Sequence, residues 1–306
     1  MTEAVNSSSR PKNTSPECVV RLDRIVLGAR RALESTEATD KNRAPSVPAI
    51  PGFKLFNDFR ARPQGRVPTY ARVRLLRSLE NNSLARIQHE RVMPWLRPFR
   101  VTLVGDDRQG VTPDEIRRFV TQFSSHRLSL VEIAFDFDPS SGVDEDFVLR
   151  HGQFGKSRRR KDRGGRDQVR YGSRASPKLV RCYWKRQLGC YRVELELHSG
   201  LLRKYKVRDS GDFTRLPQKL FPAHIAFVRV RWRALDAYLT RRFQSKGKVI
   251  LEEAQRRAES SLRRATGYLA RQGVPNPHRF LQRLSINSEV AAALEQWAKK
   301  FEVKIA

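Results

Sequence analysis

The sequence is poor in cysteine and has no long apolar run. The 3 Cys among 306 residues, Cys18, Cys182 and Cys190, are an odd number without framework spacing, which argues against a disulfide-stapled extracellular fold and against a Cys/His zinc cluster. No stretch is long and apolar enough for a transmembrane helix, and the first residues, MTEAVNSSSRPKN, are polar. These absences predict a soluble cytoplasmic protein without a membrane partner.

Two catalytic motifs are also missing. None of the six histidines sits in a His-x-His pair, which disfavours the class of DNA nickases that hold a metal with two histidines. No Gly-x-x-x-x-Gly-Lys-Ser/Thr phosphate loop is present, which argues against a built-in helicase motor.

Positive charge, by contrast, is abundant. The chain has 61 Lys and Arg against 32 Asp and Glu, a formal net charge of +29. A surplus of this size predicts a polyanionic partner, and nucleic acid fits best because the release of condensed counterions drives that association. Ribosome-bound and membrane-surface proteins share this composition, so the charge alone leaves the function open.

The distribution of residue types divides the chain into three parts. Residues 1–50 are rich in Ser, Thr, Asn, Pro and charge and predict a flexible basic tail, in which only Cys18–Leu33 has an amphipathic pattern. Residues 51–210 alternate between strand and helix patterns and form the expected catalytic domain. Residues 211–306 are mostly helical, with 23 Lys and Arg against 9 Asp and Glu over 201–306. This last part is expected to bind duplex DNA, as in a helix-turn-helix variant, or to brace the sheet.

Local patterns predict the elements of the central part. Strands are expected at 99–105 and 130–138 and three times within 170–198, and Thr112 caps a helix that starts with Pro-Asp-Glu. Val73–Leu84 fits either a strand or a helix. The basic run Lys156–Asp167 predicts a mobile loop that grips phosphate. The fold class is therefore α+β, a mainly antiparallel sheet with helices on one face, followed by a helical region.

The later helices are expected at three places. Helical periodicity covers 216–243, although the middle of that window also fits a strand. A clearer helix spans 249–269, and a last one spans 288–301 with Ser288 as its cap.

Acidic residues gather on one face of two strands. Side chains alternate along a strand, which places Glu132, Asp136 and Asp138 together on the first strand and Glu194 and Glu196 together on the second. Carboxylates that repel one another need a cation, and hard oxygen ligands suit Mg²⁺ or Mn²⁺. The alternative is a solvated edge strand whose charges discourage aggregation.

A tyrosine flanked by cations lies between these strands. Alternation puts Tyr183 on one face with Arg181 and Lys185, while Tyr191 faces the core with its apolar neighbours. With a metal nearby, Tyr183 is suited to attack a phosphodiester, and Arg181, Lys185 or Arg174 to stabilise the anionic transition state. The same cations are expected to lower the pKa of Tyr183 and so to help it ionise.

Four blocks here resemble a known family. They read Tyr171-Gly-Ser-Arg-x-Ser176, Arg181-Cys-Tyr183-Trp-Lys185, Arg192-Val-Glu194-Leu-Glu196-Leu197 and, upstream, Val131-Glu132-Ile133-Ala134-Phe135-Asp136. Their order is similar to that in plasmid and phage rolling-circle replication initiators of the Rep-trans, or replication initiation factor, family. Three departures stand out: Glu132 replaces an Asp, Leu130 replaces an Arg, and Trp184 replaces a commonly polar residue.

The resemblance implies an activity and its residues. The family nicks one strand of an origin through a tyrosine, forms a 5′-phosphotyrosyl intermediate and rejoins the strand with help from a divalent metal. By motif, Tyr183 is the nucleophile, and Glu132, Asp136 and Glu194 are metal candidates. Origin DNA, single-stranded and duplex, is the implied partner, with a host helicase and a second copy of the chain as further candidates.

Two other functions fit the same residues. One is a basic DNA- or RNA-binding protein without catalysis, and the other is a metal-dependent nuclease that uses water. In each case, basic side chains are expected to contact nucleic acid: Lys156, Arg158, Arg159, Arg160, Lys161, Arg163, Arg170, Arg256, Arg257, Arg263 and Arg264.

Overall fold

The structure, a computed structural model, describes most of the chain. The described residues are 18–30, 49–59, 70–90, 99–123, 125–141, 143, 148–149, 157–161, 167–173, 175–220, 226–260, 262–283 and 286–302. Arg174, Lys156 and Arg163, which the sequence places in the site or in the phosphate grip, lie outside these ranges.

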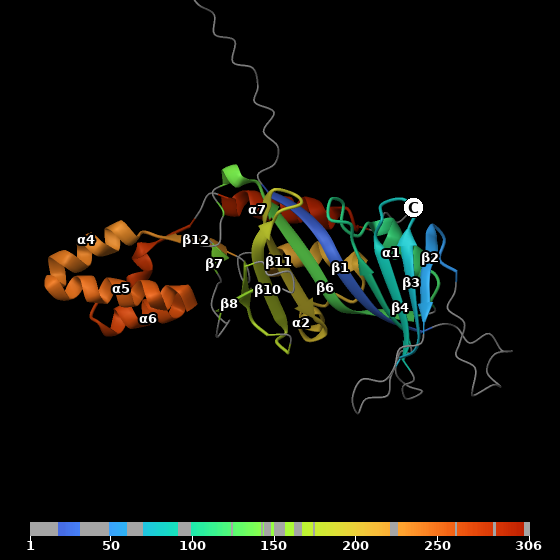
Figure 1. The fold of residues 1–306 in the computed structure, drawn as a ribbon, viewed down its shortest axis with the longest axis horizontal. Coiled ribbons are helices and arrows are strands. Elements are labelled where there is room, and N and C mark those ends of the chain that lie inside the picture. The colour runs from blue at the N-terminus through green and yellow to red at the C-terminus, as the bar shows by residue number, and fades with distance from the viewer. Residues whose placement is uncertain are drawn as a thin grey trace, which may run out of the picture.

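A ten-stranded sheet dominates the described chain (Figure 1). Across the sheet the strands are β2 (Phe53–Phe59), β3 (Tyr70–Ser78), β4 (Leu84–Glu90), β5 (Phe99–Val104), β1 (Cys18–Arg30), β6 (Ser125–Phe137), β11 (Cys190–His198), β10 (Lys178–Lys185), β9 (Asp167–Tyr171) and β8 (Ser157–Lys161). Each neighbouring pair is antiparallel. The predicted α+β class with a mainly antiparallel sheet is confirmed.

Helices cover one face of this sheet. They are α1 (Pro113–Val120), α2 (Ser199–Lys204), α3 (Leu216–Leu220) and α7 (Ile286–Lys299), with the 3₁₀ turn η2 (Ser210–Arg215); a second 3₁₀ turn, η1 (Pro139–Ser141), follows β6 and buries no residue. From α7, Val290, Leu294 and Trp297 join the same buried core as Phe135 and Phe137 of β6. The opposite side of the sheet, which we call the polar face, carries the charged residues.

The predicted start of α1 is confirmed in detail. The Thr112 hydroxyl accepts a hydrogen bond from the Glu115 backbone N–H at 3.2 Å, and the Glu115 carboxylate accepts one from the Thr112 N–H at 3.0 Å. This capping box satisfies two of the amide groups that a helix leaves unpaired at its N-terminus.

The prediction of a flexible tail is wrong for Cys18–Arg30. This segment is β1, which lies between β5 and β6 at the centre of the sheet. Leu22, Ile25 and Leu27 are each at most 1% exposed, so the amphipathic pattern noted within the tail is that of a core strand. The Ser- and Pro-rich residues on either side conceal it, and they lie outside the described ranges.

Two other local interpretations change. Ser157–Lys161, expected in a mobile loop, is the edge strand β8, because backbone hydrogen bonds to β9 do not depend on the charge of the side chains. The undecided segment 73–84 belongs to β3 and to the turn before β4.

A helical unit forms a second core at one end of the molecule (Figure 1). It comprises α4 (Trp232–Phe243), α5 (Ser245–Ser260), α6 (Leu262–Arg271) and η3 (Pro277–Phe280), so the helix predicted over 249–269 is divided in two. The crossing of α4 and α5 requires Gly247, where an added Cβ would lie 2.6 Å from the Leu239 carbonyl oxygen.

The helical unit is inserted between two paired strands. β12 (Ala226–Val230) precedes it and β13 (Leu281–Arg283) follows it, and the two pair antiparallel, while β12 also pairs with β7 (Val148–Leu149). No helix within the described ranges is long and apolar enough to cross a membrane.

The central position of β1 can be tested by substitution. Ile25→Ala is expected to lower the free energy of unfolding by about 2–5 kcal/mol, since it leaves a cavity in the core beneath the sheet. Leu79→Ala removes the same number of carbons from a side chain that is 69% exposed and should change stability by less than about 0.5 kcal/mol. Urea unfolding measures both, and equal effects would show that β1 is not part of the core.

Candidate metal centre

A β-bulge in β1 places an unexpected carboxylate on the polar face. Leu22 pairs with Ile133 and Arg24 with Glu132, so Asp23 between them is the extra residue. A bulge lets successive residues share one side of a strand. Asp23 therefore joins Arg21 and Arg24 beside the acidic strand β6.

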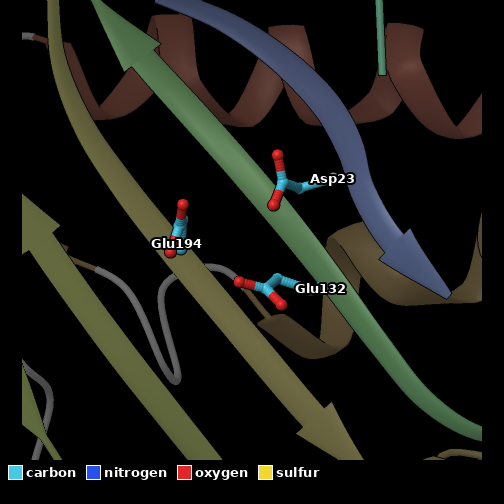
Figure 2. Close-up of side chains that lie close together, drawn as sticks. All are labelled: Asp23, Glu132 and Glu194. Atoms are coloured by element: carbon cyan, nitrogen blue, oxygen red, sulfur yellow. The ribbon is translucent and has the colours of Figure 1, made fainter. Parts of the chain in front are cut away.

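Three carboxylates from three strands meet at this point. Asp23 of β1, Glu132 of β6 and Glu194 of β11 each offer an oxygen, and these oxygens lie within 4.8 Å of one another (Figure 2). Glu132 and Glu194 are buried, and Asp23 is partly exposed. We refer to these residues as the acidic triad. The sequence identified Glu132 and Glu194 but missed Asp23.

Arginines partner the triad on the polar face. Arg181 contacts Glu132, and its Nε lies 2.8 Å from Glu194 Oε2. Arg24 Nη2 lies 2.6 Å from Glu132 Oε2 and 2.7 Å from Glu196 Oε2, so it joins the two acidic strands. Glu132 Oε1 is buried against the Arg181 guanidinium, so both oxygens of Glu132 have an arginine partner.

Arg192 forms the most deeply buried ion pair. Its side chain is 1% exposed, and Nε and Nη2 donate to the two oxygens of Asp136 at 2.6 and 2.9 Å. Nη1 also donates to Asp23 at 3.3 Å. Burial lowers the pKa of Arg192, but Asp136 and Asp23 outweigh that effect and raise it, so the guanidinium stays charged.

Tyr183 reaches the triad from β10. Its hydroxyl donates a hydrogen bond to Glu194 Oε1, and in the sheet register Tyr183 lies opposite Arg192. A tyrosine oxygen and a candidate metal ligand are thus in direct contact.

The expected lowering of the Tyr183 pKa is wrong for this geometry. Burial and the charge of Glu194 raise the pKa of Tyr183, and the nearby Arg192 only partly offsets them. Lys185 does not assist, because its Nζ lies 2.6 Å from Asp107 Oδ1. Tyr183 is therefore a neutral phenol whose proton lies on a hydrogen bond to a carboxylate.

The acidic triad could hold a metal ion. Among the residues that the structure describes, the polar-face ion pairs include six carboxylates, Asp23, Asp107, Glu132, Asp136, Glu194 and Glu196, and five cations, Arg21, Arg24, Arg181, Lys185 and Arg192. The set has one excess negative charge. An all-oxygen donor set of this kind suits a hard metal ion.

The other predicted metal ligands lie apart from the triad. Asp136 is held by Arg192 and Arg21. Glu196 pairs with Arg24, and its Oε1 lies 2.5 Å from His198 Nε2. Asp138 is exposed beyond the end of β6 and accepts hydrogen bonds from Ser140, which lower its pKa. Asp136 and Glu196 therefore lie beside the triad, and Asp138 lies away from it. The candidate metal ligands are the three triad carboxylates.

The predicted nucleic-acid contacts fall in two regions. Arg158, Arg159, Arg160 and Lys161 belong to β8, of which only the backbone is described, and Arg170 of β9 lies opposite Arg181. In the helical unit, Arg256 and Arg257 of α5 pair with Glu253, while Arg264 of α6 is exposed. Arg263 is in α6, and its side chain is outside the described part.

One signal in the sequence could have revealed Asp23. The run Arg21-Leu-Asp23-Arg24 interrupts an otherwise alternating apolar strand with charges at two successive positions, which is what a bulge produces. The burial of Arg192 could not be predicted locally, because it depends on Asp136, a partner 56 residues away.

Comparisons with known proteins are limited. A scan against protein-family models finds no match, and no curated protein matches the sequence. A solved structure, that of a rolling circle replication initiator protein from Geobacillus stearothermophilus, is similar with a TM-score of 0.37 and 14% identity over 69% of this chain and 86% of that chain. A likeness of this size carries no argument about function, which must be inferred from the site geometry and the sequence motifs.

Manganese binding should depend on pH through Asp23. Burial, and then the charge of Glu194, raise the pKa of the Asp23 carboxyl from 3.8 to about 6, so in metal-free protein its ionisation lowers the stability of the fold between these two pH values. Mn²⁺ is therefore expected to raise the Tm more at pH 7.5 than at pH 5, where it competes with a proton.

The variant Asp23→Asn separates these two effects. At pH 7.5 it should raise the stability of the metal-free protein by about 1–3 kcal/mol and remove most of the Mn²⁺ response. Asp138→Asn is the matched control and should leave that response unchanged. An equal Mn²⁺ shift in Asp23→Asn and the unmodified protein would show that the cation binds elsewhere.

Proposed function

We propose that the protein nicks one DNA strand through Tyr183, holds the 5′ end covalently and later rejoins it. The observation that carries this proposal is the hydrogen bond from the Tyr183 hydroxyl to Glu194, a member of the acidic triad. A nucleophile, a proton acceptor and a candidate metal site thereby share one carboxylate. The triad alone would fit many metal enzymes, and the tyrosine makes the covalent route specific.

The chemistry follows from this contact. Tyr183 Oη attacks the scissile phosphorus, the bond from phosphorus to the 3′ oxygen breaks, and a 5′-phosphotyrosyl ester forms. The phenolic proton passes to Glu194 and then to the leaving 3′ oxygen, which departs as a neutral hydroxyl, while the phosphotyrosyl diester keeps the single negative charge of the original phosphodiester. Because the pKa of Tyr183 is raised, this transfer must accompany the attack, and Glu194 has to act as a general base. The reverse attack by a 3′ hydroxyl restores the strand and the tyrosine.

Nearby cations would stabilise the transition state. Arg181 contacts Glu132 and Glu194 from the strand that carries Tyr183, so its guanidinium can turn toward a phosphate without leaving the site. A divalent cation held by Asp23, Glu132 and Glu194 would withdraw negative charge from the phosphate oxygens. Replication initiation of the rolling-circle type is the form of this activity that the four sequence blocks support.

A purely binding function is the second candidate. Each triad carboxylate has an arginine partner, and the network of six carboxylates and five cations in the described chain is close to neutral without a metal. Such a network can hold strands together without any chemistry.

The helical unit is proposed to bind duplex DNA. From Trp232 to Arg271 the sequence has ten Lys and Arg and four Asp and Glu. Arg241, Arg242 and Lys246 are exposed around the junction of α4 and α5, and within the described residues none of the three forms an ion pair. Unpaired surface cations of this kind suit the phosphates of a duplex.

Replacing the nucleophile should abolish covalent capture. The substrate is supercoiled DNA that carries the replication origin of the plasmid or phage that encodes the protein, incubated with Mn²⁺. It is expected to yield a protein–DNA adduct with the unmodified chain and none with Tyr183→Phe. The matched control is Tyr191→Phe, since Tyr191 is buried in the core and 6% exposed. Denaturing electrophoresis of labelled DNA detects the adduct.

Each alternative has its own result in this assay. An undiminished adduct in Tyr183→Phe would move the nucleophile elsewhere. Nicking without any adduct would identify a nuclease that uses water, and neither nicking nor adduct would leave the binding function.

Removing charge from the helical unit should weaken duplex binding selectively. A triple change of Arg241, Arg242 and Lys246 to Ala is expected to reduce the slope of log K against log salt by roughly 2–3, because each lost phosphate contact contributes about 0.9. Adduct formation on a single strand should not change. The control removes three exposed lysines elsewhere, Lys219, Lys299 and Lys300, and an identical loss there would indicate a general effect of net charge.

A further inference from the structure

A second bulge exposes an aromatic ring on β2. Leu55 pairs with Leu76 and Asn57 with Leu75, so Phe56 is the extra residue. Its side chain is 62% exposed, and the Arg77 guanidinium lies over the ring, 4.9 Å from its centroid. Arg77 belongs to the polar face, so the bulge directs Phe56 to the same face as the acidic triad, which lies on strands farther across the sheet.

A continuous cross-strand row joins this ring to the triad. Lys54 pairs with Arg77, Arg77 with Leu84 and Leu84 with Val104. Val104 in turn pairs with Arg24, and Arg24 with Glu132. Four strand spacings separate Arg77 from Glu132, which is roughly 19 Å. At 3.4 Å for each stacked nucleotide, that distance corresponds to about six nucleotides.

The cations at the two ends of this row differ in their partners. Near the triad, Arg24, Arg181 and Arg192 all have carboxylate partners. On β2–β5 the polar face presents four exposed cations, Lys54, Arg77, Arg86 and Arg100, and none of them forms an ion pair with the described residues. This end of the face therefore has uncompensated positive charge.

Apolar surface lies between those cations. Leu84 is 44% exposed and Val104 is 37% exposed, and both are in the row. An exposed ring stacked with arginine, apolar side chains and unpaired cations together match unpaired bases on a phosphate backbone. A duplex keeps its bases inside and offers no ring faces to Phe56.

We propose that the polar face of β2–β5 binds single-stranded DNA and guides the strand that continues from the scissile phosphate. Phe56 and Arg77 stack on bases, while Lys54, Arg86 and Arg100 contact phosphates. The direction toward the triad rests on the proposed nicking function, but the binding of a single strand does not require it.

The test measures binding in a chain that cannot react. The full chain with Tyr183→Phe is titrated into a fluorescein-labelled oligothymidylate of roughly 20 nucleotides, longer than the ~4–16 nucleotides of a single-strand site. Adding Phe56→Ala is expected to weaken binding about tenfold, and Arg77→Ala to weaken it by a similar factor. The control Leu55→Ala truncates an apolar side chain on the same strand that is 50% exposed and should leave binding unchanged.

The outcomes separate this proposal from the nicking function. Equal affinity in the Phe56→Ala and Leu55→Ala variants, or an equal loss for a duplex of the same length, would overturn the single-strand surface even if Tyr183 forms an adduct. A selective loss for the single strand supports the surface even if no adduct is ever found. Because Phe56 and Arg77 are exposed, unfolding curves should be the same for all variants, which excludes a folding defect.

Discussion

The polar face depends on one buried cation, the guanidinium of Arg192. It is 1% exposed and holds both oxygens of Asp136, and it also donates to Asp23 and to the Asp107 carbonyl oxygen. Removing one partner of such a pair typically costs about 3–5 kcal/mol, because the other charge is left buried and unpaired. Arg192 joins β11 to β6 and also reaches the bulge in β1. A single side chain thus links the three strands that carry the triad.

The triad is held ready by arginines that a metal or a phosphate would have to displace. Arg181 binds Glu132 and Glu194, and Arg24 binds Glu132. A metal ion can bind these carboxylates only when the guanidiniums turn away. A DNA phosphate would then give the guanidiniums a new partner. Metal affinity measured without DNA should therefore be lower than three carboxylates alone would give.

Much of this fold could be predicted from alternation, and the site only in part. Strand 190–198 and the acidic strand β6 could be predicted because the two faces of each strand differ in composition. The same alternation placed Glu132, Glu194 and Tyr183 on one side of the sheet, as the registers show. β1 was not readable, because the residues around it resemble a tail and Asp23 breaks its pattern. Phe56 was missed because a bulge breaks the alternation of β2 as well. The pKa of Tyr183 also depends on burial and on Glu194, which no local pattern contains.

The helical unit begins and ends at nearly the same point. The Arg231 N–H donates to the Phe280 carbonyl oxygen at 2.8 Å, and the strands on either side pair with each other. The chain therefore leaves the small three-stranded sheet at the end of β12, builds a separate core and returns beside β12 as β13, before α7 packs on β1. A segment with adjacent ends can be replaced by another of different length without altering the path of the remaining chain. This topology lets the helical unit be exchanged while the strands that carry the acidic triad stay unchanged.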